Sequence, residues 1–147
     1  MPSTVQAVVA LGSNIAPRAK RLEAALAAIA ALPRTRIIKV GSVIDTEPVD
    51  VPAEFSSLRF LNQIVLCETS LEALDFLHRM QEIEIAQGRV RGPVRNAPRT
   101  IDLDLIAFGD LVCDGPELTL PHPRARQRAF VTEPLFELIP DFVWPDE

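Results

Sequence analysis

Hydrophobic residues in this chain fall into short runs rich in β-branched side chains and longer runs with a helical period. The short runs are too brief for helices, so they predict largely buried strands. The predicted strands cover residues 5–11, 35–46, 60–67 and 101–108. The second strand is expected to bend or bulge at Gly41, because glycine inside a strand pattern often marks such a break.

The longer runs predict two main helices and a shorter third helix. The first lies between Pro17, which suits an initial helical turn, and Pro33, which ends the pattern. The second is expected to start at Ser70 and to end near Gly88, with leucine and isoleucine at helical spacing between them. The third helix is expected over residues 129–138.

The order of these elements is β-α-β-β-α-β, which is that of a ferredoxin-like α+β sandwich. In this fold an antiparallel sheet carries both main helices on one face. Asp114 and Gly115 predict the turn of a small additional hairpin before the last, C-terminal helix. The length of 147 residues and the 48% hydrophobic content fit one domain over residues 1–147, with a single sizeable core.

The composition argues against several classes of protein. No apolar stretch is long enough to span a bilayer, and the first residues lack a secretory signal pattern, so we expect a cytoplasmic protein without a membrane partner. A net charge of -5 argues against binding nucleic acid through the overall field. Cys67 and Cys113 form no CxxC pair, so neither a disulfide nor a zinc site is expected.

Asp102 and Asp104 are the sharpest candidates for chemistry. Residues two apart on a strand point to the same face, so these carboxylates lie side by side while Leu103 points to the opposite face. Two adjacent negative charges are costly unless a cation or basic groups neutralise them, and Mg²⁺ prefers carboxylate oxygens among protein ligands. Taken alone, the pair also fits a solvated strand face.

An arginine-rich segment just before this strand favours the chemical interpretation. Its members are Arg89, Arg91, Arg95 and Arg99, and a second cluster follows at Arg124, Arg126 and Arg128. Planar guanidinium groups suit bidentate binding of phosphate, and phosphoryl-type transfer needs a metal and cations around the phosphates. A loop that binds RNA backbone is the competing interpretation, although the chain has no tyrosine and one tryptophan to stack on bases.

Three weaker candidates remain open when each is considered alone. His122 lies between two prolines that hold the backbone extended, and it fits a local structural role as well as a place in a site. The turn predicted at residues 12–14 fits either an amide cradle for a ligand or a plain strand-to-helix connection. Phe60 and Asn62 share a strand face that suits a flat heterocycle, but a buried Phe and a capping Asn show the same pattern.

Taken together, these segments resemble the family of 6-hydroxymethyl-7,8-dihydropterin pyrophosphokinases over almost the whole chain. The landmarks are residues 10–14, 60–62, 88–91, 98–104 and 120–123, with Arg128 and Phe130. The run Arg-Thr-Ile-Asp-Leu-Asp-Leu with His-Pro downstream is specific, whereas Gly-Ser-Asn is weak by itself. The resemblance implies the ferredoxin-like fold and a transferase of folate biosynthesis that moves the pyrophosphoryl group of ATP onto the pterin hydroxymethyl group and releases AMP.

The resemblance also implies roles for particular residues. Asp102 and Asp104 would bind two Mg²⁺ ions that bridge the ATP phosphates, and Arg89 and Arg99 would be the catalytic arginines. The ATP site would be lined by Glu84, Arg91, Leu105, Thr119, His122 and Arg128. The pterin ring would lie between Phe60 and Phe130, with its edge contacted by Asn62 and by backbone groups near Thr46 and Val49.

The expected partners are therefore the small molecules pterin and ATP, bound by a monomer. One rival is another nucleotide-dependent transferase that uses the same metal pair on a different acceptor. The other is a ferredoxin-like module that binds a nucleotide or RNA without catalysis. Formation of AMP with a pyrophosphorylated pterin distinguishes the proposed enzyme from both.

Overall fold

The computed structural model describes residues 3–47, 59–88 and 100–147. Its strands are β1 (Val5–Ser13), β2 (Thr35–Val40), β3 (Ile44–Thr46), β4 (Phe60–Thr69), β5 (Asp102–Phe108), β6 (Cys113–Asp114) and β7 (Thr119–Leu120). Its helices are α1 (Arg18–Ala30), α2 (Ala73–Ala86) and α3 (Ala129–Leu138), with a short 3-10 helix at Ala125–Gln127. In these residues, no helix is long and apolar enough to cross a membrane.

The main sheet is antiparallel and has the strand order β2-β4-β1-β5, with β3 also paired to β4. Strand β1 is therefore central, and β5 lies at an edge. Two helices connect strands in the order β1-α1-β2 and β4-α2-β5, which confirms the predicted ferredoxin-like arrangement. The small sheet of β6 and β7 is the predicted additional hairpin.

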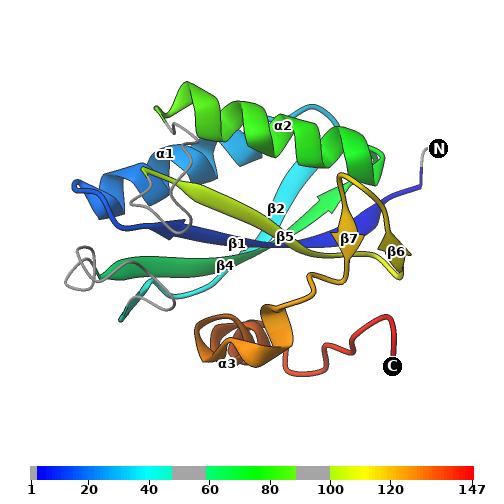
Figure 1. Cartoon of the computed structure of the whole chain (residues 1–147). Coiled ribbons are helices and arrows are strands. Elements are labelled where there is room, and N and C mark those ends of the chain that lie inside the picture. The colour runs from blue at the N-terminus through cyan, green and yellow to red at the C-terminus, as the bar shows by residue number, and fades with distance from the viewer. Residues whose placement is uncertain (1–2, 48–58, 89–99) are drawn as a thin grey trace.

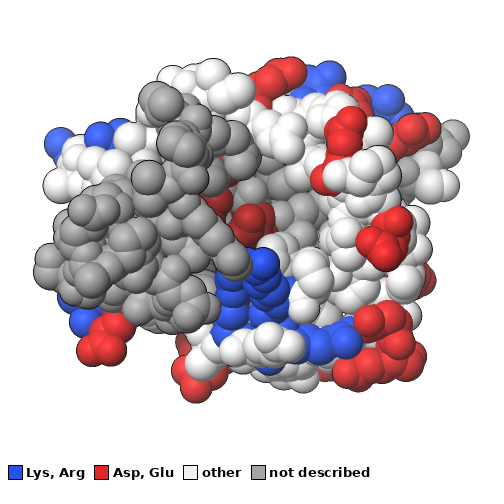
Figure 2. All heavy atoms as spheres, in the orientation of Figure 1, with Lys and Arg blue, Asp and Glu red and all other residues white. Residues whose placement is uncertain are grey.

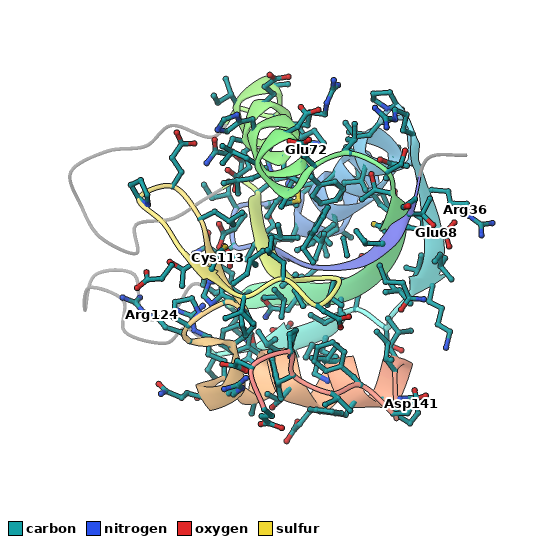
Figure 3. All side chains as sticks on the ribbon, turned by 90° about the vertical axis from the view of Figure 1, so that its right-hand side faces the viewer. Arg36, Glu68, Glu72, Cys113, Arg124 and Asp141 are labelled. Carbon is teal, nitrogen blue, oxygen red and sulfur yellow. The ribbon has the colours of Figure 1, made fainter. Side chains whose placement is uncertain are left out.

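The sheet divides the apolar interior into two clusters, where the sequence predicted a single core. Residues at alternate positions of the strands pack under α1 and α2, as Val9 and Val65 do with Phe76. The intervening positions pack against α3, as Ile64 and Ile106 do. Figure 1 shows α1 and α2 on one face of the sheet and α3 on the other, and Figure 3 shows the same layers from the side.

Several element boundaries differ from the prediction. Gly12 and the residue after it continue β1 instead of forming a turn, because they pair with β4. The predicted second strand is interrupted after Val40, and its register shift lies between Ile37 and Lys39. At Gly41 the backbone approaches β4 so closely that an added Cβ would lie 2.8 Å from the Ile64 carbonyl oxygen.

The second helix begins at Ala73, three residues after the predicted Ser70. Ser70 is held outside the helix, because its hydroxyl accepts a hydrogen bond from Arg34 Nε and its N–H donates to the Arg34 carbonyl. The third helix has the predicted bounds. Residues 48–58, before β4, and residues 89–99, which contain the first arginine cluster, lie outside the described residues.

The two cysteines are free thiols. Cys67 is fully buried in β4, and burial raises the pKa of its thiol to about 11. It therefore stays protonated at neutral pH and packs as a small hydrophobic side chain.

Candidate functional site

The two aspartates of β5 lie on the face of the sheet that carries α3. Asp102 and Asp104 are half-buried and alternate with Leu103 and Leu105, which are buried under α1 and α2. Ile106, the next residue on the aspartate side, packs in the α3 cluster. The side-by-side placement of the two carboxylates, predicted from the spacing, is thus confirmed by the burial pattern.

Strand register connects Asp102 to the predicted pterin residues. Gly12 of the central strand is paired with Asp102 on one side and with Asn62 on the other. Directly opposed residues in antiparallel strands point to the same face, so the three residues form one row across the sheet. Two strand spacings separate the ends of this row, which places the backbones of Asn62 and Asp102 about 10 Å apart.

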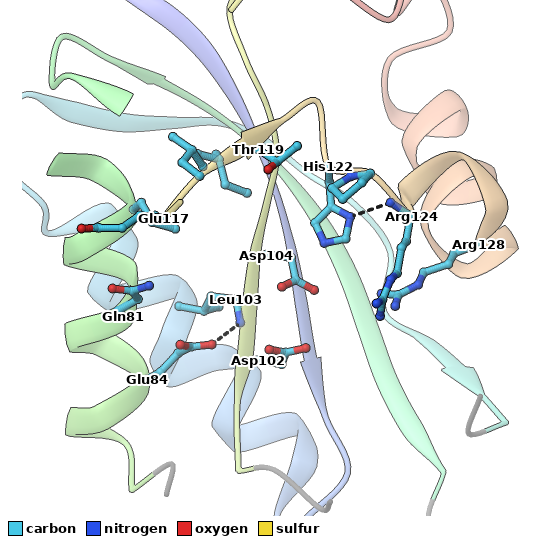
Figure 4. A pocket seen from close by; sticks show the side chains of 14 residues that line it. Gln81, Glu84, Asp102, Leu103, Asp104, Glu117, Thr119, His122, Arg124 and Arg128 are labelled. Carbon is cyan, nitrogen blue, oxygen red and sulfur yellow. Dashed lines mark hydrogen bonds between the residues drawn. The ribbon is translucent and has the colours of Figure 1, made fainter. Parts of the chain in front are cut away.

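A cavity of about 420 Å³ extends over the outer edge of β5. Its walls come from α2, β5, the β6–β7 hairpin and the segment that follows the hairpin (Figure 4). The lining residues are Leu77, Gln81, Glu84, Asp102, Leu103, Asp104, Leu105, Glu117, Leu118, Thr119, His122, Pro123, Arg124 and Arg128. Figure 2 shows acidic atoms inside a hollow of the surface and basic atoms beside it.

Glu84 is the buried acid of the α2 wall. Only 3% of the residue is exposed, and its Oε2 accepts a hydrogen bond of 2.8 Å from the backbone N–H of Leu103. A buried carboxylate requires such partners because loss of hydration is costly. Farther along the same wall, His78 Nε2 lies 2.5 Å from Glu117 Oε2, and this contact joins α2 to the hairpin.

His122 faces the aspartates from the segment after the hairpin (Figure 4). Its backbone N–H donates to the Ile106 carbonyl at 2.9 Å, and its ring Nδ1 accepts from the Arg124 backbone N–H at 3.2 Å. Burial and the positive charge of Arg128 lower the pKa of His122, with a smaller lowering from Arg124, against the opposing effect of Asp102. The imidazole is therefore neutral at pH 7, with its proton on Nε2.

The three arginines of the second cluster lie in two different environments. Arg124 and Arg128 line the cavity, and the Arg128 guanidinium also lies 5.7 Å from the centre of the Phe130 ring. Arg126 instead lies over Trp144 and forms an ion pair with Asp146. The 3-10 helix explains the division, because it turns successive side chains in different directions.

The predicted pterin residues are only partly brought together. Asn62 Nδ2 donates to Thr46 Oγ1 at 2.5 Å, and Thr46 is paired with Phe60 across β3 and β4. Phe130 is half-buried on α3 and packs against the hydrophobic cluster between the sheet and α3. Val49 lies outside the described residues, as do Arg89, Arg91 and Arg99.

Five of the six residues predicted around ATP line the cavity: Glu84, Leu105, Thr119, His122 and Arg128. The sequence did not indicate Gln81 and Glu117, which have no distinctive neighbours in the chain. Arg124 was visible as a member of an arginine cluster, but nothing in its spacing separated it from Arg126.

The donor set at the aspartates fits Mg²⁺ that is shared with a phosphate ligand. Asp102 and Asp104 offer carboxylate oxygens on one face beside the cavity. Among the residues that the structure describes, no group of three or more His, Cys, Asp or Glu side chains is placed to hold a metal ion. Mg²⁺ is commonly bound through one or two carboxylates together with substrate phosphates and water, and Asp102 and Asp104 supply such a pair of carboxylates.

A family model described as 7,8-dihydro-6-hydroxymethylpterin-pyrophosphokinase matches residues 8–140. The matched range contains every residue that lines the cavity, together with Asn62, Gly12 and Phe130. The match therefore includes the whole of the candidate site in the described part of the chain.

Curated relatives agree with this match. The 2-amino-4-hydroxy-6-hydroxymethyldihydropteridine pyrophosphokinase of Pseudomonas aeruginosa is 44% identical over 138 residues, covering 94% of this chain and 83% of that protein. The protein of the same name from Haemophilus influenzae is 37% identical over 142 residues, covering 97% and 86%.

A solved structure shares the fold at low sequence identity. The crystal structure of Plasmodium falciparum HPPK-DHPS with pteroate matches 97% of this chain with a TM-score of 0.75 and 15% identity. This chain spans 40% of the length of that protein. The similarity concerns the arrangement of helices and strands.

Proposed function

Because the chain belongs to the 7,8-dihydro-6-hydroxymethylpterin-pyrophosphokinase family, we propose that it uses ATP and Mg²⁺ to pyrophosphorylate 6-hydroxymethyl-7,8-dihydropterin in folate biosynthesis. The pterin hydroxyl oxygen forms a bond to the β-phosphorus of ATP, and the bond from that phosphorus to the α,β-bridging oxygen breaks. AMP leaves with the bridging oxygen, and the hydroxyl proton passes to solvent. Family membership disfavours the alternative of a binding module without catalysis.

The row formed by Asn62, Gly12 and Asp102 carries this proposal. It joins an amide suited to a heterocycle edge with a carboxylate suited to a metal, on one face and about 10 Å apart. A flat acceptor that lies over Gly12 would direct its hydroxymethyl group toward the phosphates beside β5. Holding two reactants in this relation removes much of the entropic cost of their encounter.

The cavity is the proposed nucleotide site. Asp102 and Asp104 would hold Mg²⁺, which would supply positive charge to offset that of the phosphates. His122 would donate its Nε2–H to a phosphate oxygen, since the neutral ring has its proton there. The ATP site in this proposal is also lined by Glu84, Arg91, Leu105, Thr119 and Arg128, and the catalytic arginines are Arg89 and Arg99.

The proposed pterin site lies beside the cavity on the α3 face. Phe60 and Phe130 would lie against the two faces of the ring, while Asn62 and backbone groups near Thr46 and Val49 contact its edge. The bond from Asn62 to Thr46 supports this role, because it orients the amide before the substrate arrives.

The proposal extends to a cytoplasmic monomer with one domain. Edge strand β2 carries the exposed charges of Arg36 and Lys39 and a register shift, features that discourage pairing with a second chain. The other edge, at β5, is contacted by Glu84 and by the backbone of His122.

The test is formation of AMP and pyrophosphorylated pterin from ATP, Mg²⁺ and hydroxymethyldihydropterin. Replacing either Asp102 or Asp104 by asparagine should lower kcat about a thousandfold, since a metal supplies several kcal/mol of charge stabilisation. The products are measured by chromatography, with circular dichroism spectra to verify folding.

Asp110 provides the matched control, because it is an exposed acid just beyond the end of β5. Asp110→Asn should retain native turnover. Undiminished AMP formation by both site variants would refute the role of the aspartates, and ADP as the product would refute pyrophosphoryl transfer.

A further inference from the structure

Glu84 contacts the outer edge of β5. Among the described strands, β5 is paired only with β1 in the main sheet, so amides on its outer side need partners from elsewhere. The Leu103 N–H finds such a partner in Glu84 Oε2 at 2.8 Å, across a helix-to-strand contact. Both residues are buried, with 3% and 6% of their surfaces exposed.

The position of Leu103 makes this hydrogen bond relevant to both aspartates. Its amide belongs to the peptide unit that joins Asp102 to Leu103, and Asp104 is the next residue. The Leu103 side chain is packed in the hydrophobic cluster under α1 and α2, so this segment of β5 is also held from the face that carries these two helices. A fixed peptide plane and a packed side chain together restrict the directions in which the two carboxylates point.

The geometry separates Glu84 from the aspartates themselves. Asp102 and Asp104 point to the α3 face, whereas Glu84 approaches the strand edge from α2 (Figure 4). All three acids line the same cavity, and the contact of Glu84 with β5 is made through the Leu103 backbone N–H.

We propose that Glu84 is a positioning residue, which holds the Leu103 amide so that Asp102 and Asp104 are preorganised for Mg²⁺ and nucleotide. This inference rests on the proposed function and adds to it a role that Glu84 exercises through the backbone of β5. The role requires a hydrogen-bond acceptor at the end of the side chain. It does not require a negative charge in contact with the ligand.

Two substitutions separate an acceptor from a charge. Glu84→Gln retains a carbonyl oxygen that accepts from the Leu103 N–H, although a neutral acceptor is weaker than a carboxylate. Glu84→Met has a similar length and no comparable acceptor, which leaves the buried amide without its partner. Glu82→Met is the matched control, because Glu82 is exposed on the same helix two residues away.

The first measurement is the Mg²⁺ concentration that gives half-maximal turnover, with KM for the pterin determined in parallel. Glu84→Met should raise this concentration on the order of 10- to 100-fold, as loss of a supporting contact to metal ligands typically does. Glu84→Gln should stay much closer to the native protein, and Glu82→Met should equal it. The KM for the pterin should change little in all three variants.

The second measurement does not depend on turnover. Hydrogen exchange by mass spectrometry of the ligand-free protein should show faster exchange in the peptide containing Leu103 for Glu84→Met only. Calorimetric titration with α,β-methylene ATP and Mg²⁺ should show the same order of affinities as the kinetic constants.

Two results would overturn the inference. If Glu84→Gln impairs nucleotide binding as severely as Glu84→Met, then the carboxylate charge acts on the ligand directly. If Glu84→Met keeps both the native hydrogen-exchange rate and the native Mg²⁺ dependence, then the hydrogen bond from Leu103 to Glu84 does not position Asp102 and Asp104. Failure of the proposed function would appear separately, as absence of AMP formation by the native protein, while the exchange result would remain interpretable.

Discussion

Gly12 occupies the centre of the row that joins the two halves of the proposed site. A Cβ atom at this position would lie 3.2 Å from Asn62 Oδ1 and 3.7 Å from Phe60 Cδ1. The absence of a side chain thus lets the buried backbone of Gly12 lie close to the Asn62 amide and the Phe60 ring. The sequence indicated a strand-to-helix turn here, because glycine followed by serine and asparagine is typical of turns.

Replacing Gly12 by alanine should weaken pterin binding more than nucleotide binding, because the added methyl group crowds Asn62 and Phe60 but has no close contact with Asp102. Crowding of about 1–3 kcal/mol corresponds to a roughly 5- to 150-fold higher KM for the pterin. Steady-state kinetics with each substrate varied in turn measures the effect. Gly115→Ala is the control, since its Cβ would have only an ordinary contact of 3.4 Å. Equal pterin KM values for both variants would contradict this role of Gly12.

His122 makes the folded protein sensitive to acid. Its pKa is lowered mainly by burial and by Arg128, so below the ordinary value of 6.5 the unfolded chain binds more protons at this site than the folded protein. Its contribution to stability is therefore complete above that value and declines as the pH falls toward the lowered pKa. Urea unfolding in metal-free buffer from about pH 7.5 to about pH 5 should show this loss.

As the pH falls over this range, the free energy of unfolding of His122→Gln should decrease less than that of the native protein, since the variant has no imidazole at this position to protonate. His78 is the only other histidine, and His78→Gln serves as the control that retains the dependence due to His122. Identical pH profiles for the native protein and His122→Gln would show that the burial of this imidazole does not affect folding.

At the scale of elements, the segment after α3 packs against the face of the sheet that carries α3. Trp144 is 6% exposed and belongs to the cluster formed with α3. Its ring lies 5.1 Å from that of Phe142, and the Arg126 guanidinium lies 4.7 Å from its centre. Since Arg126 belongs to the 3-10 helix between His122 and Arg128, this packing supports the element that carries one wall of the cavity.

Trp144→Ala should lower the free energy of unfolding by about 3–5 kcal/mol, because a large buried ring is lost from a packed cluster. Val143→Ala, at a neighbouring residue that is 70% exposed, should change it by less than about 0.5 kcal/mol. Urea unfolding followed by circular dichroism gives both values. Similar losses in the two variants would mean that the segment does not pack as described.

For the whole molecule, the position of the site follows from the two layers. Helices α1 and α2 cover one face of the sheet, and α3 packs against the other. On that second face Gly12 and Asn62 are buried and the aspartates are half-buried, and the cavity opens beside the aspartates at the edge strand β5. The polar row therefore meets the cavity at its Asp102 end.

The sequence by itself determined features that depend on local backbone geometry. Alternation around Asp102 and Asp104 placed the carboxylates together, the longer hydrophobic runs located the three α-helices of the described residues, and the order of elements gave the fold class. These inferences succeed because side-chain direction repeats with fixed periods along a strand or helix. The Ser70 boundary failed because its contact with Arg34, a distant residue in the chain, outweighs the local preference.

Only the tertiary structure decided which distant residues meet. Asn62 and Asp102 are joined through Gly12 by the register of three strands, and Glu84 reaches Leu103 because α2 packs against the sheet edge. Register and helix packing depend on the side chains of the whole interior, so no period within one segment specifies them. The sequence therefore established the chemical groups and their local directions, while packing of the two layers decided how those groups form one site.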